Sequence, residues 1–311
     1  MRLSLLVGLL ALSACGAEPD APPITPDADD LGVPARLAAR LGDADVHVLD
    51  QAGDAYALVV LSTPAGDVIV QWADLDSVAV AQVVGPRVEG VATAGAFHPT
   101  APSPRFEMVP SGALVRQQSA DDRLLAVVNG AFFETPGEPS TQLAFPVAEN
   151  GAVVTGGSSP YGPGRPGAEG ERWSRPLRAL GLADGAVRVV DYDPATGVPL
   201  GAPAFAEAVV SYAPDAHPTR VATRFHVLGP VDADSTGASS ELVIATGLNT
   251  TIDALSALVS RLGVAPVHQV ALDGGASVLV WNRRAGTLQR PTAAGGLDPQ
   301  PLPHYLVLRH R

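Results

Sequence analysis

The chain has 311 residues, 46% of them hydrophobic, and its 32 acidic residues outnumber its 20 basic residues, which gives a formal net charge of −12 at pH 7. Nucleic-acid binding needs a basic field around the phosphates, so we expect no nucleic-acid partner. All twenty basic residues are arginines, and the lack of lysine excludes a P-loop, a Schiff-base lysine and a Ser-Lys dyad.

The chain begins with the pattern of a secretory signal. Arg2 precedes an apolar run from Leu3 to Leu12 that is too short to span a membrane. The sequence LSAC at 12–15 resembles the lipobox of bacterial lipoproteins, which implies cleavage before Cys15 and acylation of its thiol. Cys15 is the only cysteine, so the chain has neither an internal disulfide nor a cysteine metal site. An ordinary signal peptide with a coincidental cysteine is the alternative.

The composition of the chain after the signal peptide indicates a tether followed by folded segments. Residues 15–34 are rich in Pro and Asp and too poor in apolar residues to fold, so we predict a disordered tether after a signal peptide at 1–14. We predict an amino-terminal lobe over 35–122 and a further domain over 123–311.

Two helices are predicted. The first begins at Pro34 and presents one apolar face. The second, near 252–262, begins with the capping-box spacing of Thr250 and Asp253 and ends at Gly263, which suits a left-handed cap. The apolar residues of its buried face are Ile252, Leu255, Val259 and Leu262.

Most of the remaining chain is predicted to be β-strand. Short segments rich in β-branched residues alternate with turn residues at intervals of about ten, as in antiparallel structure. The fold class is therefore α+β, a strand-rich mixed β-sheet system with few helices and one prominent helix near 252–262. The predicted strands are 45–50, 55–62, 66–72, 87–92, 104–109, 123–129, 186–191, 206–212, 220–228, 240–246, 268–272, 277–282 and 303–309.

Four Asx-Gly pairs mark turns or site residues. The pairs at 150–151 and 184–185 have alternating, half-polar flanks, which indicate surface hairpins. The pairs at 129–130 and 273–274 follow nearly unbroken apolar runs, as buried central strands do. A polar group at the end of a buried strand has rigid support and an open side, which favours a site. A plain turn is the alternative for both pairs, and the flanks alone leave the two interpretations open.

Three stretches of sequence resemble the phosphodiester glycosidase family, to which the mannose-6-phosphate uncovering enzyme and many bacterial proteins belong. They are VNGAFF at 128–133, ENGAVVTGG at 149–157 and ATGLNTTIDALSALVSRLGVAPVHQVALDGGAS at 245–277. The match in order and spacing covers roughly 125–309. Ala131 and Ala276 depart from it, because the family has glycine at both positions.

The resemblance implies an enzyme that removes a sugar from a sugar-1-phosphodiester. The phosphate leaving group has a second pKa near 6, so it departs with little protonation and the usual pair of carboxylates becomes unnecessary. On this basis Asp273 activates water or stabilises the oxocarbenium ion, and Arg224 neutralises the phosphate. The Thr219-Arg220 pair is a rival match for Arg224, and a structural ion pair is the alternative role of Arg224.

The resemblance also implies supporting residues. Asn129 and Ser277 are expected to position the substrate by hydrogen bonds, and Glu134 is the candidate for a second carboxylate. The expected substrate-binding backbone is Gly130, Gly274 and Gly275. We expect Asn129 and Asp273 to face one cleft although 144 positions separate them.

Metal binding finds less support in the sequence. Asp232, Asp234 and Thr236 are spaced like the start of a calcium loop, but Val243 stands where the closing glutamate is required, which favours a polar turn. The histidines, including His226 and His268, lack paired spacing, which favours structural roles. No cofactor or metal is therefore expected, with calcium as the alternative.

The predicted function is an envelope-anchored hydrolase that cleaves the glycosidic bond of sugar-1-phosphodiesters in glycan or cell-wall material. The alternative is a glycan-binding lipoprotein that does not turn over its ligand because Ala131 and Ala276 alter the site. The expected partners are a carbohydrate or sugar-phosphate substrate and a bacterial membrane, reached through the lipid on Cys15. The expected location is the cell envelope, periplasmic or surface-exposed.

Overall fold

The computed structural model describes residues 32–42, 44–95, 98, 102–134, 139–155, 173–183, 185–200, 205–292 and 300–311. The predicted signal peptide, Cys15 and nearly all of the predicted tether lie outside the described residues. Among the described residues, no helix has both the length and the apolar character that crossing a membrane requires.

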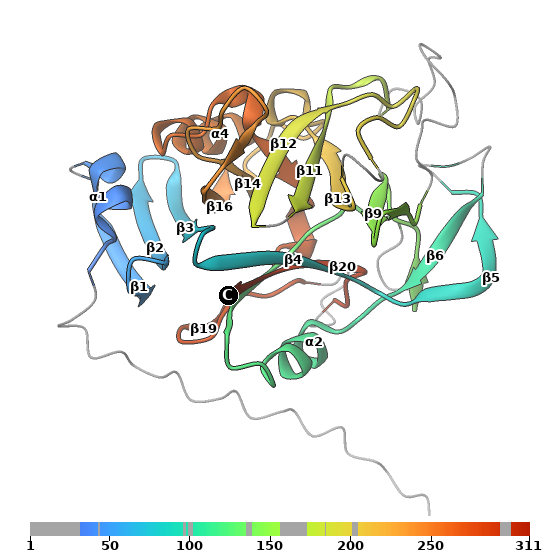
Figure 1. Ribbon diagram of the computed structural model, residues 1–311, viewed down its shortest axis with the longest axis horizontal. Helices are drawn as coiled ribbons and strands as arrows, with labels where there is room; N and C mark the ends of the chain where they lie inside the picture. The colour runs from blue at the N-terminus through green and yellow to red at the C-terminus, as the bar shows by residue number, and fades with distance from the viewer. Residues whose placement is uncertain are drawn as a thin grey trace, which may run out of the picture.

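Two large β-sheets pack face to face, and helices cover their outer faces (Figure 1). Within the described chain the larger sheet has twelve strands and the smaller has five. Helices α1 (Ala35–Leu41) and α4 (Ile252–Arg261) pack on the larger sheet, and α2 (Ser111–Gln118) packs on the smaller one. The layers therefore run helix, sheet, sheet, helix.

The strand order is set by pairings between segments far apart in the chain. The path through the larger sheet is β1 (Val46–Ala52), β2 (Tyr56–Thr63), β3 (Gly66–Asp74), β16 (Glu241–Thr250), β14 (Thr223–Pro230), β17 (Val270–Leu272), β13 (Glu207–Tyr212), β11 (Leu177–Ala183), β12 (Ala186–Tyr192) and β15 (Ala238–Ser239), and β9 (Val147–Glu149) with β10 (Ala152–Val153) joins at β13. The smaller sheet is β19 (Gly286–Gln289), β18 (Val280–Asn282), β7 (Leu124–Asn129), β20 (His304–His310) and β4 (Val78–Val84). A third sheet joins β5 (Arg87–Thr93), β6 (Ser103–Glu107) and β8 (Ser140–Thr141).

Successive side chains of a strand point to opposite faces of its sheet, so each sheet can pack against a layer on either side. In β20, Leu306 and Leu308 join the core between the two sheets, whereas Tyr305 and Val307 face α2 on the outside. In the larger sheet, β3 likewise sends Ile69 inward and neighbouring residues toward α1 and α4. Each fully buried aliphatic side chain contributes about 1.5–3 kcal/mol to burial free energy. Both faces of both sheets are therefore buried over their central strands.

The prominent helix lies where it was predicted, but its N-cap residue differs from the prediction. The N-cap is Thr251, whose hydroxyl accepts from the Ala254 N–H at 3.2 Å. Thr250 is instead the last residue of β16, and the Asp253 carboxylate pairs with Arg220 at 2.6 Å. Gly263 has φ +99°, as the predicted left-handed cap requires.

The strand-rich fold is confirmed, but the prediction of mixed sheets is wrong for the described strands. Every pairing between named strands is antiparallel. The helix α2 and seven strands have no counterpart among the predicted helices and strand ranges; the strands are β4, β8, β9, β10, β11, β15 and β19. In β11 the sequence LRALGLA consists largely of good helix formers, and its pairing with β12 on one side and β13 on the other holds it extended.

Both predicted surface hairpins are confirmed. Asn150 (φ 52°) and Gly151 (φ 80°) connect β9 to β10, with the two positive φ angles that a type I′ turn demands. Gly185 (φ 86°) lies in the turn between β11 and β12, where Ala183 pairs with Ala186.

Residues 35–122 supply strands to both large sheets. β3 pairs with β16 along seven positions, and β4 pairs with β20 along seven. Figure 1 shows β1 to β3 continuing the larger sheet beside α1, and β4 lying along β20. The segments 35–122 and 123–311 thus share their sheets.

Candidate functional site

The two Asx-Gly pairs that follow buried strands meet in space. All residues of β7 and β17 are buried, and β17 lies between β14 and β13. Beyond the strands, the Asp273 N–H donates to the Gly130 carbonyl at 3.0 Å. The structure therefore brings the sequences NGAFF and LDGGAS together, from opposite sheets.

Asn129 joins the two segments through its side chain. Its Nδ2 donates to the Asp273 carbonyl at 2.7 Å, and its Oδ1 accepts from the Leu279 N–H at 2.8 Å. The Leu279 N–H can only donate, so it fixes which end of the amide is oxygen. Asn129 is 2% exposed, and both the nitrogen and the oxygen of its amide have partners. It therefore holds the backbone of Asp273 from behind the pocket wall and does not face a cleft.

His226 completes this network in its neutral form. Its Nε2 lies 2.6 Å from Asn129 Oδ1, which only accepts, so Nε2 carries the proton and Nδ1 accepts from the Thr246 hydroxyl at 2.8 Å. Burial lowers the pKa of His226 to about 3. The predicted structural role of His226 is confirmed. His268 lies in a 3₁₀ turn (Pro266–His268), and its Nδ1 has no partner among the described residues.

Gly130 allows a second histidine to approach the backbone closely. A Cβ at this position would overlap the ring of His304 on β20. The Ala131 N–H donates to His304 Nδ1 at 3.1 Å, so Nε2 carries the proton and donates to Gln82 at 3.2 Å. Burial lowers the pKa of His304 to about 3. Gly130 thus allows close packing between β7 and β20, and it is not among the residues that line the pocket containing Asp273.

Asp273 lies at the wall of a pocket with its carboxyl group largely withdrawn from water. It is 9% exposed, and burial raises the pKa of the Asp273 carboxyl to about 7, against hydrogen bonds from Ser277 and the Gly274 N–H that lower it. The Gly274 N–H donates to Oδ1 at 2.9 Å. A carboxyl with this pKa exchanges protons readily near neutral pH, as a general acid or base must.

The pocket beside Asp273 has a volume of about 300 Å³. A Cβ on Gly274 would lie 2.7 Å from the Arg224 carbonyl, so the loop passes too close to β14 for a side chain. Gly275 has φ +60° and open space around it. The residues that line the pocket are Phe132, His217, Thr219, Val221, Thr223, Phe225, Asp273, Gly274 and Gly275.

The two candidate arginines are both held by neighbours, and neither is in the pocket lining. Arg224 lies between the lining residues Thr223 and Phe225, and its Nη2 donates to the Thr292 hydroxyl at 2.8 Å. It forms no ion pair with a described residue. Arg220 follows the lining residue Thr219 and pairs with Asp253 in the first turn of helix α4. Both arginines thus adjoin lining residues in the chain, and a neighbouring side chain holds each guanidinium group.

The remaining predicted residues fall into two groups. Ser277 is 7% exposed and bonds to Asp273 through its side chain, so it supports the carboxyl group. Glu134 belongs to another environment, since its carboxylate lies against Gly95 and its N–H donates to Gln142 at 3.1 Å. Asp273 is therefore the sole carboxylate among the described residues that line the pocket.

The two departures from the family pattern lie outside the pocket. Ala131 is 3% exposed and packs in the core between the sheets. Ala276 is exposed on the far end of the loop, where its N-terminal neighbour Gly275 still lines the pocket. Neither alanine is among the residues that line the space beside Asp273.

The segment that resembles a calcium loop forms the predicted polar turn. Asp234 Oδ1 accepts from the Thr236 N–H at 2.8 Å and from its hydroxyl at 2.6 Å, and Asp232 pairs with Arg40 at 2.9 Å. Within the described ranges, no three His, Cys, Asp or Glu side chains are grouped so that they could hold a metal ion.

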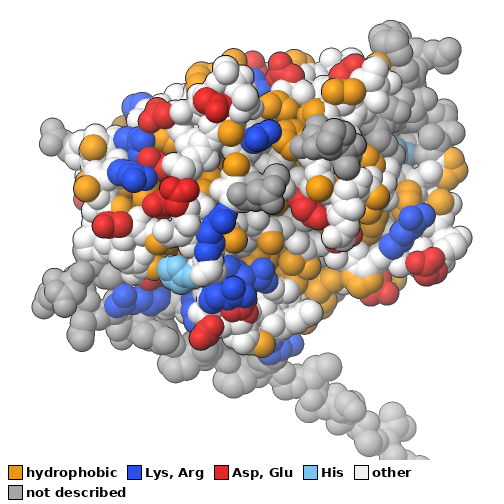
Figure 2. Space-filling view, in the orientation of Figure 1, with side chains coloured by type: hydrophobic (Ala, Val, Ile, Leu, Met, Phe, Trp, Pro, Cys, Tyr) orange, Lys and Arg blue, Asp and Glu red, His pale blue; other side chains and the backbone are white. Residues whose placement is uncertain are grey.

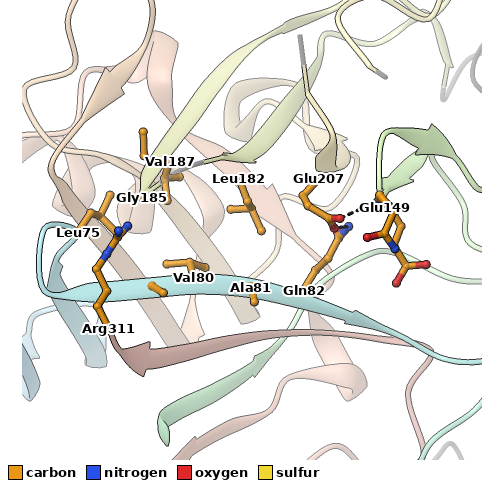
Figure 3. A pocket seen from close by; sticks show the side chains of 13 residues that line it. Leu75, Val80, Ala81, Gln82, Glu149, Leu182, Gly185, Val187, Glu207 and Arg311 are labelled. Carbon is orange, nitrogen blue, oxygen red and sulfur yellow. Dashed lines mark hydrogen bonds between the residues drawn. The ribbon is translucent and has the colours of Figure 1, made fainter. Parts of the chain in front are cut away.

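A larger pocket of about 410 Å³ lies between β4 and the β11–β12 hairpin (Figure 3). Its walls combine aliphatic and polar side chains, with Glu149 and Glu207 at one end and Arg311 at the other. Glu207 already accepts from Gln82 at 2.6 Å and from the Asn150 N–H at 2.7 Å. None of the predicted site residues lines it, so the smaller pocket, which contains Asp273, is the candidate site despite its size.

Surface charge is mixed. Figure 2 shows arginine and acidic side chains interspersed over the visible face of the described residues. An anionic ligand would therefore depend on local arginines near its site.

No motif in the sequence points specifically to His217. It lines the pocket with Asp273 although 56 positions separate them. Its ring packs edge-on against Phe225 at 5.2 Å and Tyr212 at 5.5 Å. Burial lowers the pKa of His217, and the charges of Arg220 and Arg175 lower it further. The only available signal was its place in the loop before β14, which became informative only with the pairing of β14 and β17.

The fold is similar to that of an enzyme of known activity. Over 86% of this chain and 88% of the other, it matches the catalytic domain of zebrafish N-acetylglucosamine-1-phosphodiester alpha-N-acetylglucosaminidase, auto-inhibited by its pro-peptide, with a TM-score of 0.51 and 12% identity. A hypothetical protein from Synechocystis matches with a TM-score of 0.42 and 11% identity, over 86% of this chain and 64% of that one. No protein-family model matches the sequence, and no curated protein matches it. At this identity the likeness shows the fold.

Proposed function

We propose that this chain is a hydrolase that cleaves the glycosidic bond of sugar-1-phosphodiesters in glycan or cell-wall material. The observation that carries the proposal is the Asp273 carboxyl, with a pKa of about 7, in a pocket formed by the LDGGAS loop. The likeness of the fold to the zebrafish phosphodiester glucosaminidase supports the same chemistry.

In the proposed reaction, Asp273 takes a proton from a water molecule as the water oxygen attacks the anomeric carbon. The bond between that carbon and the phosphate oxygen breaks, and the phosphate monoester departs with the electron pair. The products are the free sugar and the monoester, and the proton on Asp273 returns to solvent. The phosphate leaves without a proton donor because its second pKa is near 6. One carboxylate is then sufficient.

The charge of the phosphate has to be balanced by arginine. We assign this role to Arg224, which adjoins Gly274 through its backbone and is held in place by Thr292. Arg220 is the rival, since it lies beside the lining residue Thr219. A guanidinium group can bind two phosphate oxygens at once, which fixes orientation as well as charge.

The test is the hydrolysis of the methyl phosphodiester of N-acetylglucosamine 1-phosphate by the full chain. We expect release of N-acetylglucosamine and methyl phosphate. Release of methanol and N-acetylglucosamine 1-phosphate would show cleavage of the wrong bond and would refute the proposal. Saturable binding with neither product would favour the second candidate, a non-catalytic glycan-binding lipoprotein.

We also propose that acylation of Cys15 anchors the chain to a bacterial membrane in the cell envelope. The lipobox and the Pro- and Asp-rich segment after it support this. The attached chains would have to number two or more, because a single acyl chain binds membranes only marginally. Cys15→Ser should shift the protein out of the membrane fraction or block its processing. A variant that fractionates like the wild type would contradict the anchor.

A further inference from the structure

His217 has one ring nitrogen with an assigned partner and one without. It is 4% exposed and follows the 3₁₀ turn η2 (Pro214–Ala216). The Thr219 N–H points to Nδ1 at 3.0 Å, and a backbone N–H can only donate. Nδ1 therefore accepts from the Thr219 N–H, and in this tautomer it cannot donate to the Thr219 carbonyl, which lies 3.2 Å away. A neutral ring that accepts at Nδ1 carries its proton on Nε2.

The Nε2–H of His217 is thus a buried donor without a partner in the described structure. Leaving such a group unsatisfied costs about 1–3 kcal/mol. The ring cannot turn easily to reach another acceptor, because Phe225, Tyr212 and Phe132 pack around it at 5.2, 5.5 and 5.8 Å. The His217 residue that carries this donor is among the residues that line the pocket containing Asp273.

The arginines near His217 favour a negatively charged acceptor for its Nε2–H. Arg175 donates to the Ala216 carbonyl at 3.1 Å, directly before His217, and Arg220 lies three positions after it. Both guanidinium groups are close enough to disfavour a positive charge on the ring. The same field favours a negatively charged oxygen and keeps His217 neutral, so that it presents one N–H.

We propose that the Nε2–H of His217 donates a hydrogen bond to an anionic phosphate oxygen of the ligand that occupies this pocket. His217 is then a substrate-binding residue that orients the phosphate group relative to Asp273. This rests on the proposed function for the identity of the ligand, a sugar phosphate, but makes a claim about binding and not about turnover.

Two substitutions separate the roles of the two nitrogens. His217→Asn places an amide oxygen near the position of Nδ1, which keeps the bond from the Thr219 N–H but removes the donor at Nε2. His217→Gln places an amide N–H near Nε2 and so restores the donor. If His217 has only a structural role, the Asn variant should resemble the wild type more closely than the Gln variant does. If His217 binds phosphate, the Gln variant should be the closer of the two in its affinity for the sugar phosphate.

The experiment measures calorimetric binding of N-acetylglucosamine 1-phosphate and of free N-acetylglucosamine to the full chain. We expect His217→Asn to weaken binding of the sugar phosphate about tenfold or more, as loss of a bond to a charged group does. We expect it to leave the binding of the free sugar nearly unchanged, and His217→Gln to restore most of the affinity for the sugar phosphate.

Three outcomes would overturn the proposal. The first is that the wild type does not bind the sugar phosphate, and the second is that His217→Asn binds it with wild-type affinity. The third is that His217→Asn loses affinity equally for both ligands, which would mean that Nε2–H donates to the sugar and not to the phosphate. A wild-type protein that binds the sugar phosphate but does not hydrolyse the phosphodiester would refute the proposed activity alone, so the two failures are distinguishable.

Discussion

Asp273→Asn should lower turnover of a sugar-1-phosphodiester by about a hundredfold or more, the scale of a lost general base. The amide keeps the size of the side chain and its bond from the Gly274 N–H, so the loop should keep its shape. The substitution removes only the basicity of the Asp273 carboxylate. In the wild type, the rate should rise with pH through about 7 and then level off, because Asp273 acts as a base only when ionised.

The same substitution should stabilise the protein at neutral and alkaline pH. The folded-state pKa of Asp273, about 7, lies above the reference value of 3.8, so ionisation favours the unfolded chain. The stability that this group supplies is complete below pH 3.8 and is lost as pH rises through about 7. The loss amounts to at most roughly 4 kcal/mol. Urea unfolding at pH 4 and pH 8 should therefore show Asp273→Asn gaining on the wild type only at the higher pH.

A matched control is Asp234→Asn, in an exposed turn, which should leave turnover near the wild-type value. An Asp273→Asn protein with wild-type turnover would contradict the assignment and leave Asp273 as a turn former.

Asn129→Ala should destabilise the fold by at least about 3 kcal/mol, since it leaves three buried groups without a partner at about 1–3 kcal/mol each. These groups are the Leu279 N–H, the His226 Nε2–H and the Asp273 carbonyl. The effect should appear in urea unfolding without any ligand present. Turnover should fall too, because the backbone of Asp273 loses its support.

The control for this variant is Asn249→Ala, on the exposed face of β16, which should change stability by less than about 0.5 kcal/mol. A substrate-binding Asn129 would give the reverse pattern, with stability unchanged and ligand affinity lost. That pattern would contradict the structural role and support the interpretation from the sequence.

Features that depend on residues close together in the chain could be predicted from the sequence, whereas contacts between distant segments could not. The helix at 252–261 was predictable because its cap, apolar face and final glycine are all local, and only the choice between Thr250 and Thr251 failed. The buried strands before Asn129 and Asp273 were predictable from their apolar runs. The engagement of Asn129 by Leu279 and His226 was not, because it depends on how two sheets meet. His217 was missed for the same reason.

The position of β20 in the smaller sheet has a consequence for how the chain folds. β20 is the last strand in chain order, yet it lies between β7 and β4 and supplies His304 behind Gly130. During synthesis on a ribosome, β7 and β4 must therefore wait with open hydrogen-bonding edges until residues 304–310 emerge. Such non-local topology favours slow folding, and the intermediate with unpaired edges is the species most exposed to aggregation. The segment that bonds to the Asp273 N–H gains the support of His304 only once β20 has paired.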